Sequence, residues 1–213
     1  ENRTLVKYGM EQINAGHREA IDVLAAAAGL EARPITSHQI AYVLVPHLNA
    51  AGRMAEADAG VRLLTADSRS VMLEAARTLV SNNTERKRIQ EEDYRKCLRI
   101  AENHHAGDHF LVIEAADVHE GIAGIVAGKI KDAFGRPAVI LTGSGELYLK
   151  GTGRSTDGIN IYEMLKRHAA LFIKFGGHSG ACGFLMESAN LGRLREGLNA
   201  GIREIFEEDG TLF

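Results

Sequence analysis

The stretch LKGTGRS, residues 149–155, combines glycines with several groups that can bind phosphate. Its glycines would let the backbone approach a ligand and turn N–H groups toward it. Arg154 supplies a planar, permanently charged fork that matches phosphate oxygens, and Lys150, Thr152 and Ser155 add further donors. The spacing alone fits a plain glycine-rich hairpin with a solvated arginine equally well, because short glycine motifs often arise by chance.

A second stretch, LNAAGRM at residues 48–54, places two polar side chains among small and apolar residues. A flat turn over residues 50–52 would let Asn49 and Arg53 reach one ligand. The alternative is a turn that merely connects two helices and leaves both polar side chains in solvent. Taken by itself, the stretch favours this alternative.

The third stretch, FGGHSGACGF at residues 175–184, places His178 directly after two glycines. His178 itself lies in neither an HxxxH nor an HExxH pattern, so a metal-binding role is not favoured for it. A histidine in this setting can donate a hydrogen bond to phosphate or act as a general acid. The alternative is a histidine that is hydrogen-bonded to the backbone of a turn.

The first third of the chain must position the second stretch, and its pattern predicts short helices. Thr36 or Ser37 is the expected N-cap of one helix, and Pro46 is expected to end or kink it. Small residues around Gly52 indicate a turn that leads into a further helix over 55–64.

A single long helix is predicted over 69–105, because this segment has no Gly or Pro and is dense in Glu, Arg, Lys and Gln. Within it, Leu79, Asn83, Arg86 and Gln90 recur at three- and four-residue spacing. A helix that is so long and so polar usually bridges two bodies rather than filling a core.

After residue 106 the pattern changes to alternating strands and helices, which is typical of an α/β domain with a largely buried sheet. The expected strands are 110–116, 137–143, 146–155 and 181–187. The expected helices are 121–135, 160–176 and 190–208. Gly and Ala residues spaced through 121–130 indicate close packing of a helix on the sheet rather than a ligand loop.

The composition is that of an ordinary globular protein, with 45% apolar and 25% charged residues. A net charge of −3 gives no overall basic field, although a local cationic groove can exist on such a protein. Cys97 and Cys182 lie far apart and predict neither a disulfide framework nor a cysteine zinc site. Because no apolar stretch could span a membrane and no signal peptide is present, we expect a cytoplasmic protein. The opening residues lack an initiator methionine, which predicts a segment of a longer protein.

An ordered series of stretches resembles the DHH/DHHA1 phosphoesterase superfamily and, within it, the RecJ-like family of bacterial single-strand-specific 5′→3′ exonucleases. The stretches are ENRTLVKYGM, LNAAGRM, NNTER, HEGIAGIVAGKI, RPAVILT, KGTGRSTDGINIYEML and FGGHSGACGF. Each is weak alone, but their order and spacing from Glu1 to about Gly183 carry the resemblance.

The resemblance implies an α/β protein with the helical C-terminal part of a DHH domain over 1–67 and a long connecting helix over 68–106. It implies a DHHA1 domain with a mixed sheet over 107–213. In the family, Mn²⁺ or Mg²⁺ bound by the DHH domain activates water for phosphodiester hydrolysis, and no metal ligand is carried over to this chain. The implied partner is single-stranded nucleic acid, in DNA repair and recombination, with no membrane. This chain alone is expected to be inactive.

The resemblance also assigns residues that bind nucleic acid or phosphate. They are Asn49, Arg53, Lys150, Thr152, Arg154, Ser155, Gly176, Gly177 and His178. Of these, His178 would contact the scissile phosphate and support catalysis. The chain departs from the family at Val118, where tryptophan is frequent, and at Thr152 and Gly153, where serine or alanine is usual.

Two alternatives stay open at this point. Small DHH/DHHA1 enzymes that degrade short oligoribonucleotides or cyclic dinucleotides carry a three-glycine version of the His178 motif, whereas Phe175 precedes only two glycines here. The other alternative is a nucleic-acid-binding scaffold whose catalytic domain has decayed, which the residues upstream of such a segment would decide.

Overall fold

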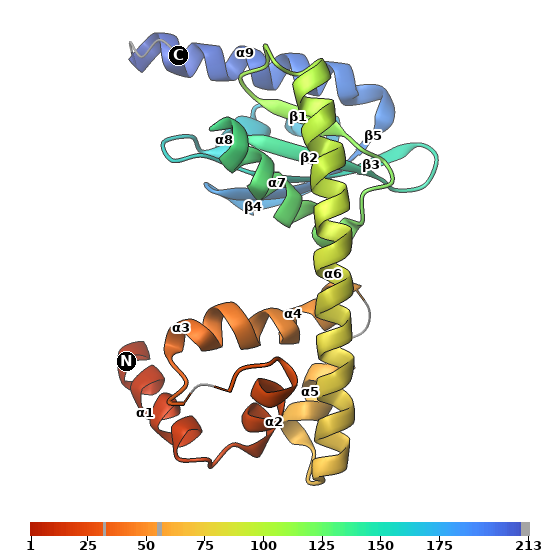
Figure 1. The fold of residues 1–213 in the computed structure, drawn as a ribbon. Helices are drawn as coiled ribbons and strands as arrows, with labels where there is room; N and C mark the ends of the chain where they lie inside the picture. Colours follow the sequence, from red (N-terminus) through yellow and green to blue (C-terminus); the bar gives the residue numbers. More distant parts are fainter. Residues whose placement is uncertain (32, 55–56, 210–213) are drawn as a thin grey trace. The chain divides into compact units, whose positions relative to one another are not determined.

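The computed structural model describes residues 1–31, 33–54 and 57–209. The chain divides into two compact units, Glu1–Arg88 and Ile89–Phe213, and the division falls inside the long helix α6 (Arg69–His104). This helix therefore contributes to both units, as its length and polarity predicted. Figure 1 traces the elements of each unit along the chain. The three ranges assigned by the family resemblance stay a prediction.

The first unit is helical, as expected. Its elements are α1 (Asn2–Asn14), α2 (Glu19–Ala27), α3 (Ser37–Gln39), a π-helical segment (Ile40–Leu44), α4 (Val45–Met54), α5 (Asp58–Thr65) and the first half of α6. Thr36 is the N-cap of α3, where its hydroxyl accepts from the Gln39 N–H over 3.2 Å. In turn, Gln39 Oε1 accepts from the Thr36 N–H over 2.8 Å, which completes a capping box. Apolar side chains from α2, α4, α5 and α6 form one buried core.

Two breaks predicted in this unit are wrong. Pro46 does not end the helix, because the helical run that begins at Ser37 continues through it to Met54, whereas a kink at Pro46 stays a prediction. The irregularity falls instead on the π-helical segment just before it. Gly52 and its neighbours form no turn, because Ala50 and Ala51 are fully buried inside α4 and their packing favours a continuous helix. Residues 55 and 56, where the next helix was predicted to begin, lie outside the described part.

The second unit contains the mixed sheet that the resemblance implied. Its strands are β1 (Leu111–Glu114), β2 (Ala138–Gly143), β3 (Tyr148–Arg154), β4 (Phe172–His178) and β5 (Ala181–Glu187). The strand order is β1-β2-β3-β5-β4, in which β1 and β2 are parallel and the remaining pairs are antiparallel. The helices are α7 (Glu120–Phe134), α8 (Ile161–Lys166) and α9 (Leu191–Asp209).

The two faces of the sheet are covered differently. On one face, side chains from all five strands pack against α8 and α9 in a continuous core that includes Val139, Phe184, Leu165 and Leu198. On the other face, α7 packs on β2 and β3. Because α7 covers only this part, the face remains open over β5 and β4.

The helix predicted over 160–176 is wrong beyond its first two turns. The α-helix ends at Lys166, and the chain re-enters the sheet as β4 after a short 3₁₀ segment. The apolar residues of this segment suit a helix and a strand equally, so the periodicity alone could not separate them. Pairing of β4 with β5 from Lys174 to His178 decides the outcome.

Candidate nucleic-acid interface

The uncovered strands β5 and β4, together with the adjoining strand β3 at the edge of α7, form a surface that we term the open face, and it brings together most of the predicted phosphate-binding residues. Cross-strand partners point to the same side of a sheet, so the pairing of β3, β5 and β4 arranges the open face in three rows. The rows are Arg154–Ala181–His178, Thr152–Gly183–Gly176 and Lys150–Leu185–Lys174. Neighbouring strands lie about 4.8 Å apart, which places the Arg154 and His178 backbones about 10 Å from each other.

The glycines of LKGTGRS, Gly151 and Gly153, lie within β3, inside the expected strand, and face the core. A Cβ at Gly151 would lie 2.1 Å from the Phe184 ring, and one at Gly153 would lie 2.6 Å from Cys182 Sγ. Both glycines therefore make room for core side chains. The expectation that they cradle a ligand with outward N–H groups is wrong.

Arg154 is held over the open face by the edge of α7. A Cβ at Gly124 would lie 2.8 Å from Arg154 Nη2 and 3.2 Å from Thr152 Cγ2, so both side chains pack closely against this glycine. Arg154 Nη1 donates to the Gly153 carbonyl over 2.8 Å. No carboxylate forms an ion pair with Arg154 among the described residues, which leaves its charge available to an anion.

Lys150 and Ser155 already have partners within the protein. Lys150 Nζ pairs with the Glu120 carboxylate at the start of α7. Ser155 Oγ donates to the Ile159 carbonyl over 2.6 Å and so stabilises the loop after β3. Thr152, between them, is half-buried and lies in the middle row of the open face. A ligand-binding role for Lys150 and Ser155 stays a prediction, and a ligand would have to compete with these bonds.

His178 ends β4 at a two-residue turn that leads directly into β5. Its Nδ1 accepts from the Gly180 N–H over 3.2 Å, so the neutral ring carries its proton on Nε2. Gly177 is required for this turn, because its φ is +152° and a Cβ would lie 2.3 Å from the Ala181 carbonyl oxygen. The exposed His178 can therefore donate from Nε2 while Nδ1 holds the turn.

Lys174 is a residue of the open face that sequence reasoning missed. It was assigned to a helix, whereas it lies on β4 opposite Leu185, with its side chain exposed. A groove of about 330 Å³ on this face is lined by residues of β3, β5 and β4, among them Lys150, Thr152, Lys174, Gly176 and Gly183. The sequence carries no clear signal for this position, because LFIKF suits a helix and a strand equally, and only the pairing of β4 with β5 places Lys174 on the open face.

In the first unit, Asn49 and Arg53 lie one turn apart on the exposed side of α4. Arg86 of α6 interacts electrostatically with Arg53, because burial and then the positive charge of Arg53 lower the pKa of Arg86. Arg86 Nε donates to Asn83 Oδ1 over 3.1 Å, and Asn83 is buried. The structure thus adds Arg86 to the basic residues around the second stretch.

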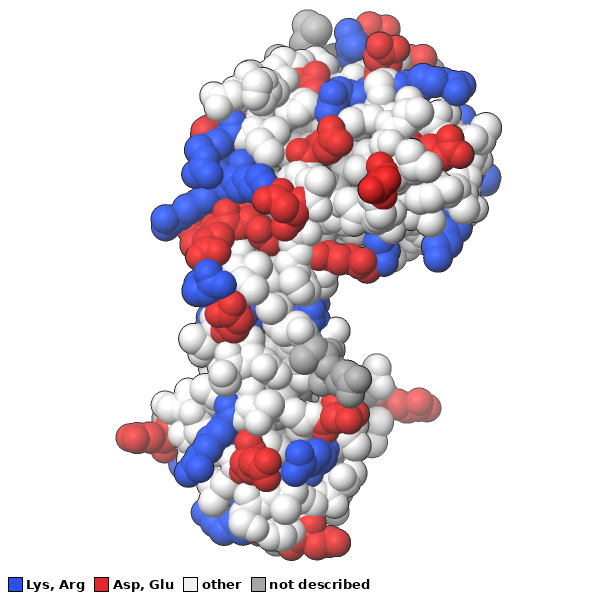
Figure 2. Space-filling model, turned by 90° about the vertical axis from the view of Figure 1, so that its right-hand side faces the viewer, with Lys and Arg blue, Asp and Glu red and all other residues white. Residues whose placement is uncertain are grey.

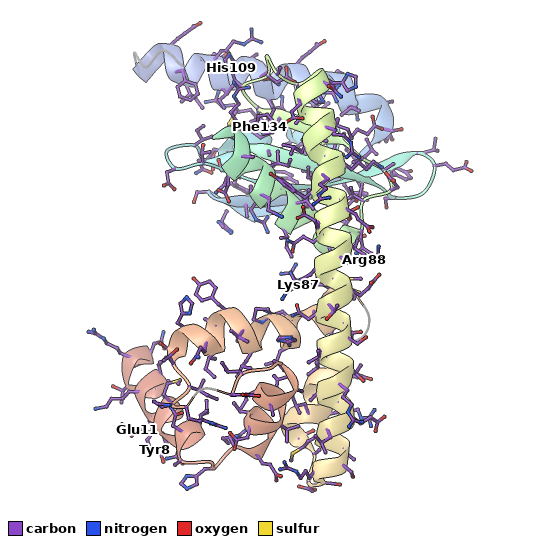
Figure 3. All side chains as sticks on the ribbon, viewed as in Figure 1. Tyr8, Glu11, Lys87, Arg88, His109 and Phe134 are labelled. Atoms are coloured by element: carbon purple, nitrogen blue, oxygen red, sulfur yellow. The ribbon has the colours of Figure 1, made fainter. Side chains whose placement is uncertain are left out.

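His47 is a buried histidine in the same basic surroundings. Its Nδ1 donates to the Val43 carbonyl over 2.7 Å. Burial lowers the pKa of His47, the bond to Val43 opposes this effect, and the charges of Lys87 and Arg86 lower the pKa further. His47 is therefore a neutral structural histidine. Lys87 and the next residue, Arg88, project from different sides of α6, as Figure 3 shows.

Neither a metal centre nor a membrane segment emerges from the described residues. No group of three or more His, Cys, Asp and Glu side chains in them could hold a metal ion, so the donor set for Mn²⁺ or Mg²⁺ does not fit this part. No helix in the same part has the length and apolarity needed to cross a bilayer. On the face drawn in Figure 2, acidic and basic side chains are interspersed.

Residues 107–204 match the family model described as the DHHA1 domain. This range includes the whole sheet, α7, α8 and both stretches that form the open face. The second unit of the chain therefore carries a DHHA1 domain.

Over most of its length the chain is RecJ-like in sequence and in structure. It is 31% identical to the single-stranded-DNA-specific exonuclease RecJ of Haemophilus influenzae over 98% of the chain and 38% of that protein. The crystal structure of Thermus thermophilus RecJ with Mg²⁺ matches at a TM-score of 0.84 and 30% identity, covering 95% of this chain and 31% of that one. A structure of exonuclease RecJ bound to manganese matches at 0.78 and 31% identity, covering 93% and 49%. The chain thus spans well under half the length of the curated relative.

Proposed function

We propose that this chain supplies the substrate-binding part of a RecJ-like 5′→3′ exonuclease that degrades single-stranded DNA. The observation that carries the proposal is the Arg154 guanidinium, which lies close to Gly124 of α7 beside the open face, donates to the Gly153 carbonyl and forms no ion pair among the described residues. A planar guanidinium held in this way can bind two phosphate oxygens at once. The curated relative is a single-stranded-DNA-specific exonuclease, which supports a DNA strand as the source of this phosphate.

In this proposal, Arg154 and Thr152 of the open face bind the phosphate at the DNA end, and His178 contacts the scissile phosphate. Arg154 contributes charge and two parallel donors, and Thr152 adds a hydroxyl from the next row. His178 donates from Nε2 on the opposite side of Ala181, where it supports catalysis at the scissile phosphate. Asn49 and Arg53 bind a further backbone phosphate on the first unit. Lys150 takes part when its pair with Glu120 opens.

Hydrolysis is assigned to the part of such an enzyme that has no counterpart in this chain. The two RecJ structures hold Mg²⁺ and manganese, and a divalent ion of this kind supplies Lewis acidity and an activated water. We propose that the chain alone binds single strands without cleaving them. A cytoplasmic role in DNA repair and recombination belongs to the same proposal.

A titration of the protein into fluorescein-labelled, 5′-phosphorylated oligo(dT), followed by fluorescence anisotropy, tests the binding role. Arg154→Ala is expected to weaken binding on the order of tenfold or more, because a charge-assisted bond contributes about 1.5–3 kcal/mol. The matched control is Arg193→Ala, which removes an exposed arginine from α9, on the other side of the sheet. Equal affinity of the Arg154→Ala variant and the parent protein would refute the proposal.

Incubation of the pure chain with Mn²⁺ and the same oligonucleotide tests the assignment of hydrolysis. The expected result is an intact oligonucleotide, since the described residues contain no metal-binding set. Cleavage that increases with protein concentration and survives repeated purification would overturn this part of the proposal, and it would leave the binding role untouched.

A further inference from the structure

Lys174 stands at the opposite end of the open face from His178. The two residues are four apart on β4, a separation of about 13 Å along the strand. Across the sheet, Lys174 and Lys150 flank Leu185 in the third row. Lys150 is neutralised by Glu120, whereas Lys174 forms no ion pair with any described residue. Lys174 is therefore the available cation of this row.

Gly176 and Gly183 pair in the row between Lys174 and His178, and the fold does not require either of them to be glycine. A Cβ at Gly176 would meet nothing within 4 Å, and one at Gly183 would meet only the Gly151 carbonyl oxygen at 3.9 Å. Neither residue has a positive φ. A glycine inside a strand weakens it, so two paired glycines facing open space indicate that another molecule approaches the backbone closely.

The groove over these glycines connects Lys174 with Thr152, and Arg154 continues the same face beyond it. A ligand that lies in this groove contacts bare backbone below and is flanked by the Lys174 ammonium. An extended chain with repeating negative charges fits this arrangement, because one charge can meet Arg154 while another meets Lys174.

We propose that Lys174 binds a second backbone phosphate of the DNA strand whose end is held by Arg154, with the strand lying over Gly176 and Gly183. This inference rests on the proposed function. It assigns to Lys174 a strand-binding role that extends the site by one row of the sheet. A thymidine 5′-monophosphate has a single phosphate and cannot contact both cations.

A salt titration of oligo(dT) binding provides the test. In Lys174→Ala, the affinity at low salt is expected to fall severalfold, and the slope of log K against log salt concentration is expected to decrease by roughly 0.7, the value for one phosphate contact on a single strand. Lys174→Arg should retain both quantities. The control is Lys166→Ala on α8, which removes another exposed charge from the other side of the sheet.

The outcomes separate the two claims. If Arg154→Ala weakens binding but Lys174→Ala changes neither the affinity nor the slope, the role of Lys174 is refuted and the proposed function stands. The role of Lys174 is also refuted if Lys174→Ala weakens the binding of thymidine 5′-monophosphate, measured by competition, as strongly as it weakens the binding of oligo(dT). If neither variant changes oligo(dT) binding, or the parent chain does not bind at low salt, the proposed function itself is refuted.

Discussion

Arg154 and His178 lie on the same face of the sheet and share one cross-strand neighbour, Ala181, which separates them. They are also linked through the main chain, because the N–H of Ser155 donates to the Gly180 carbonyl in the turn after His178 over 3.0 Å. The end of β3 and the turn between β4 and β5 are therefore fixed to each other. This link sets the distance between the two donors before any ligand binds, which lowers the entropic cost of binding.

Alanine substitutions are expected to have opposite effects on stability at Gly151, which faces the core, and at Gly176 and Gly183, which lie on the open face. Gly151→Ala places a methyl group against the Phe184 ring and is expected to lower the free energy of unfolding by about 1–3 kcal/mol. Gly176→Ala and Gly183→Ala place it in open space, so stability should be unchanged or higher by up to about 1 kcal/mol, while oligo(dT) binding weakens. Urea unfolding and anisotropy measure the two effects. Normal binding by both open-face variants would argue against a ligand over these glycines.

Variants of His178 can separate its role in the turn from a role in binding. An asparagine side chain can accept from the N–H two residues further on, as His178 Nδ1 does from Gly180, but it has no group in the place of Nε2. His178→Asn is therefore expected to keep the thermal stability of the parent protein and to bind oligo(dT) as weakly as His178→Ala. Full binding by His178→Asn would show that the residue only stabilises the turn.

The sequence predicts that the first unit is helical, and it predicts the long helix and most strands, because these patterns are clear, whereas the breaks expected within the first unit are not found. It fails at β4, where LFIKF suits either a helix or a strand and pairing with β5 decides. That single error hides Lys174, which a helix would place far from Lys150. The open face itself could not be predicted, since it follows from how far α7 extends over the sheet.

The residue types of the candidate site are easier to predict than the roles of individual residues. Arg154 and His178 could be found because a charged or titratable residue beside glycines is conspicuous in any sequence. The roles of Gly151 and Gly153 could not be found in the sequence. Two such glycines can approach a ligand when they lie in a turn, and they can make room for a core side chain such as the Phe184 ring when they lie in a strand. Only the pairing register shows which face of the strand each glycine occupies.

The ion pair between Lys150 and Glu120 predicts a variant with stronger binding. Glu120→Gln removes the carboxylate that neutralises Lys150, so oligo(dT) affinity at low salt should rise severalfold and the salt slope should steepen. Stability should change little, because the pair is exposed and such pairs contribute about 0–1 kcal/mol. Glu163→Gln on α8 is the matched control. Unchanged affinity in Glu120→Gln would place Lys150 outside the DNA path.

Protonation of His47 predicts a loss of stability in mildly acidic solution. Burial lowers the pKa of His47 in the folded chain, with the charges of Lys87 and Arg86 acting in the same direction. The unfolded chain therefore takes up the proton first as the pH falls below about 6.5, and the folded state loses stability from that point downward. Above this pH both states are neutral and the stability is fully present.

Urea unfolding followed by circular dichroism at pH 7.5 and pH 5.5 measures this effect, with His47→Gln as the comparison that cannot titrate. Each unit by which the pKa is lowered corresponds to at most about 1.4 kcal/mol. The parent protein is expected to lose more stability between the two pH values than His47→Gln does, since the other groups titrate alike in both. Identical losses in the two proteins would mean that His47 is not held neutral by its surroundings.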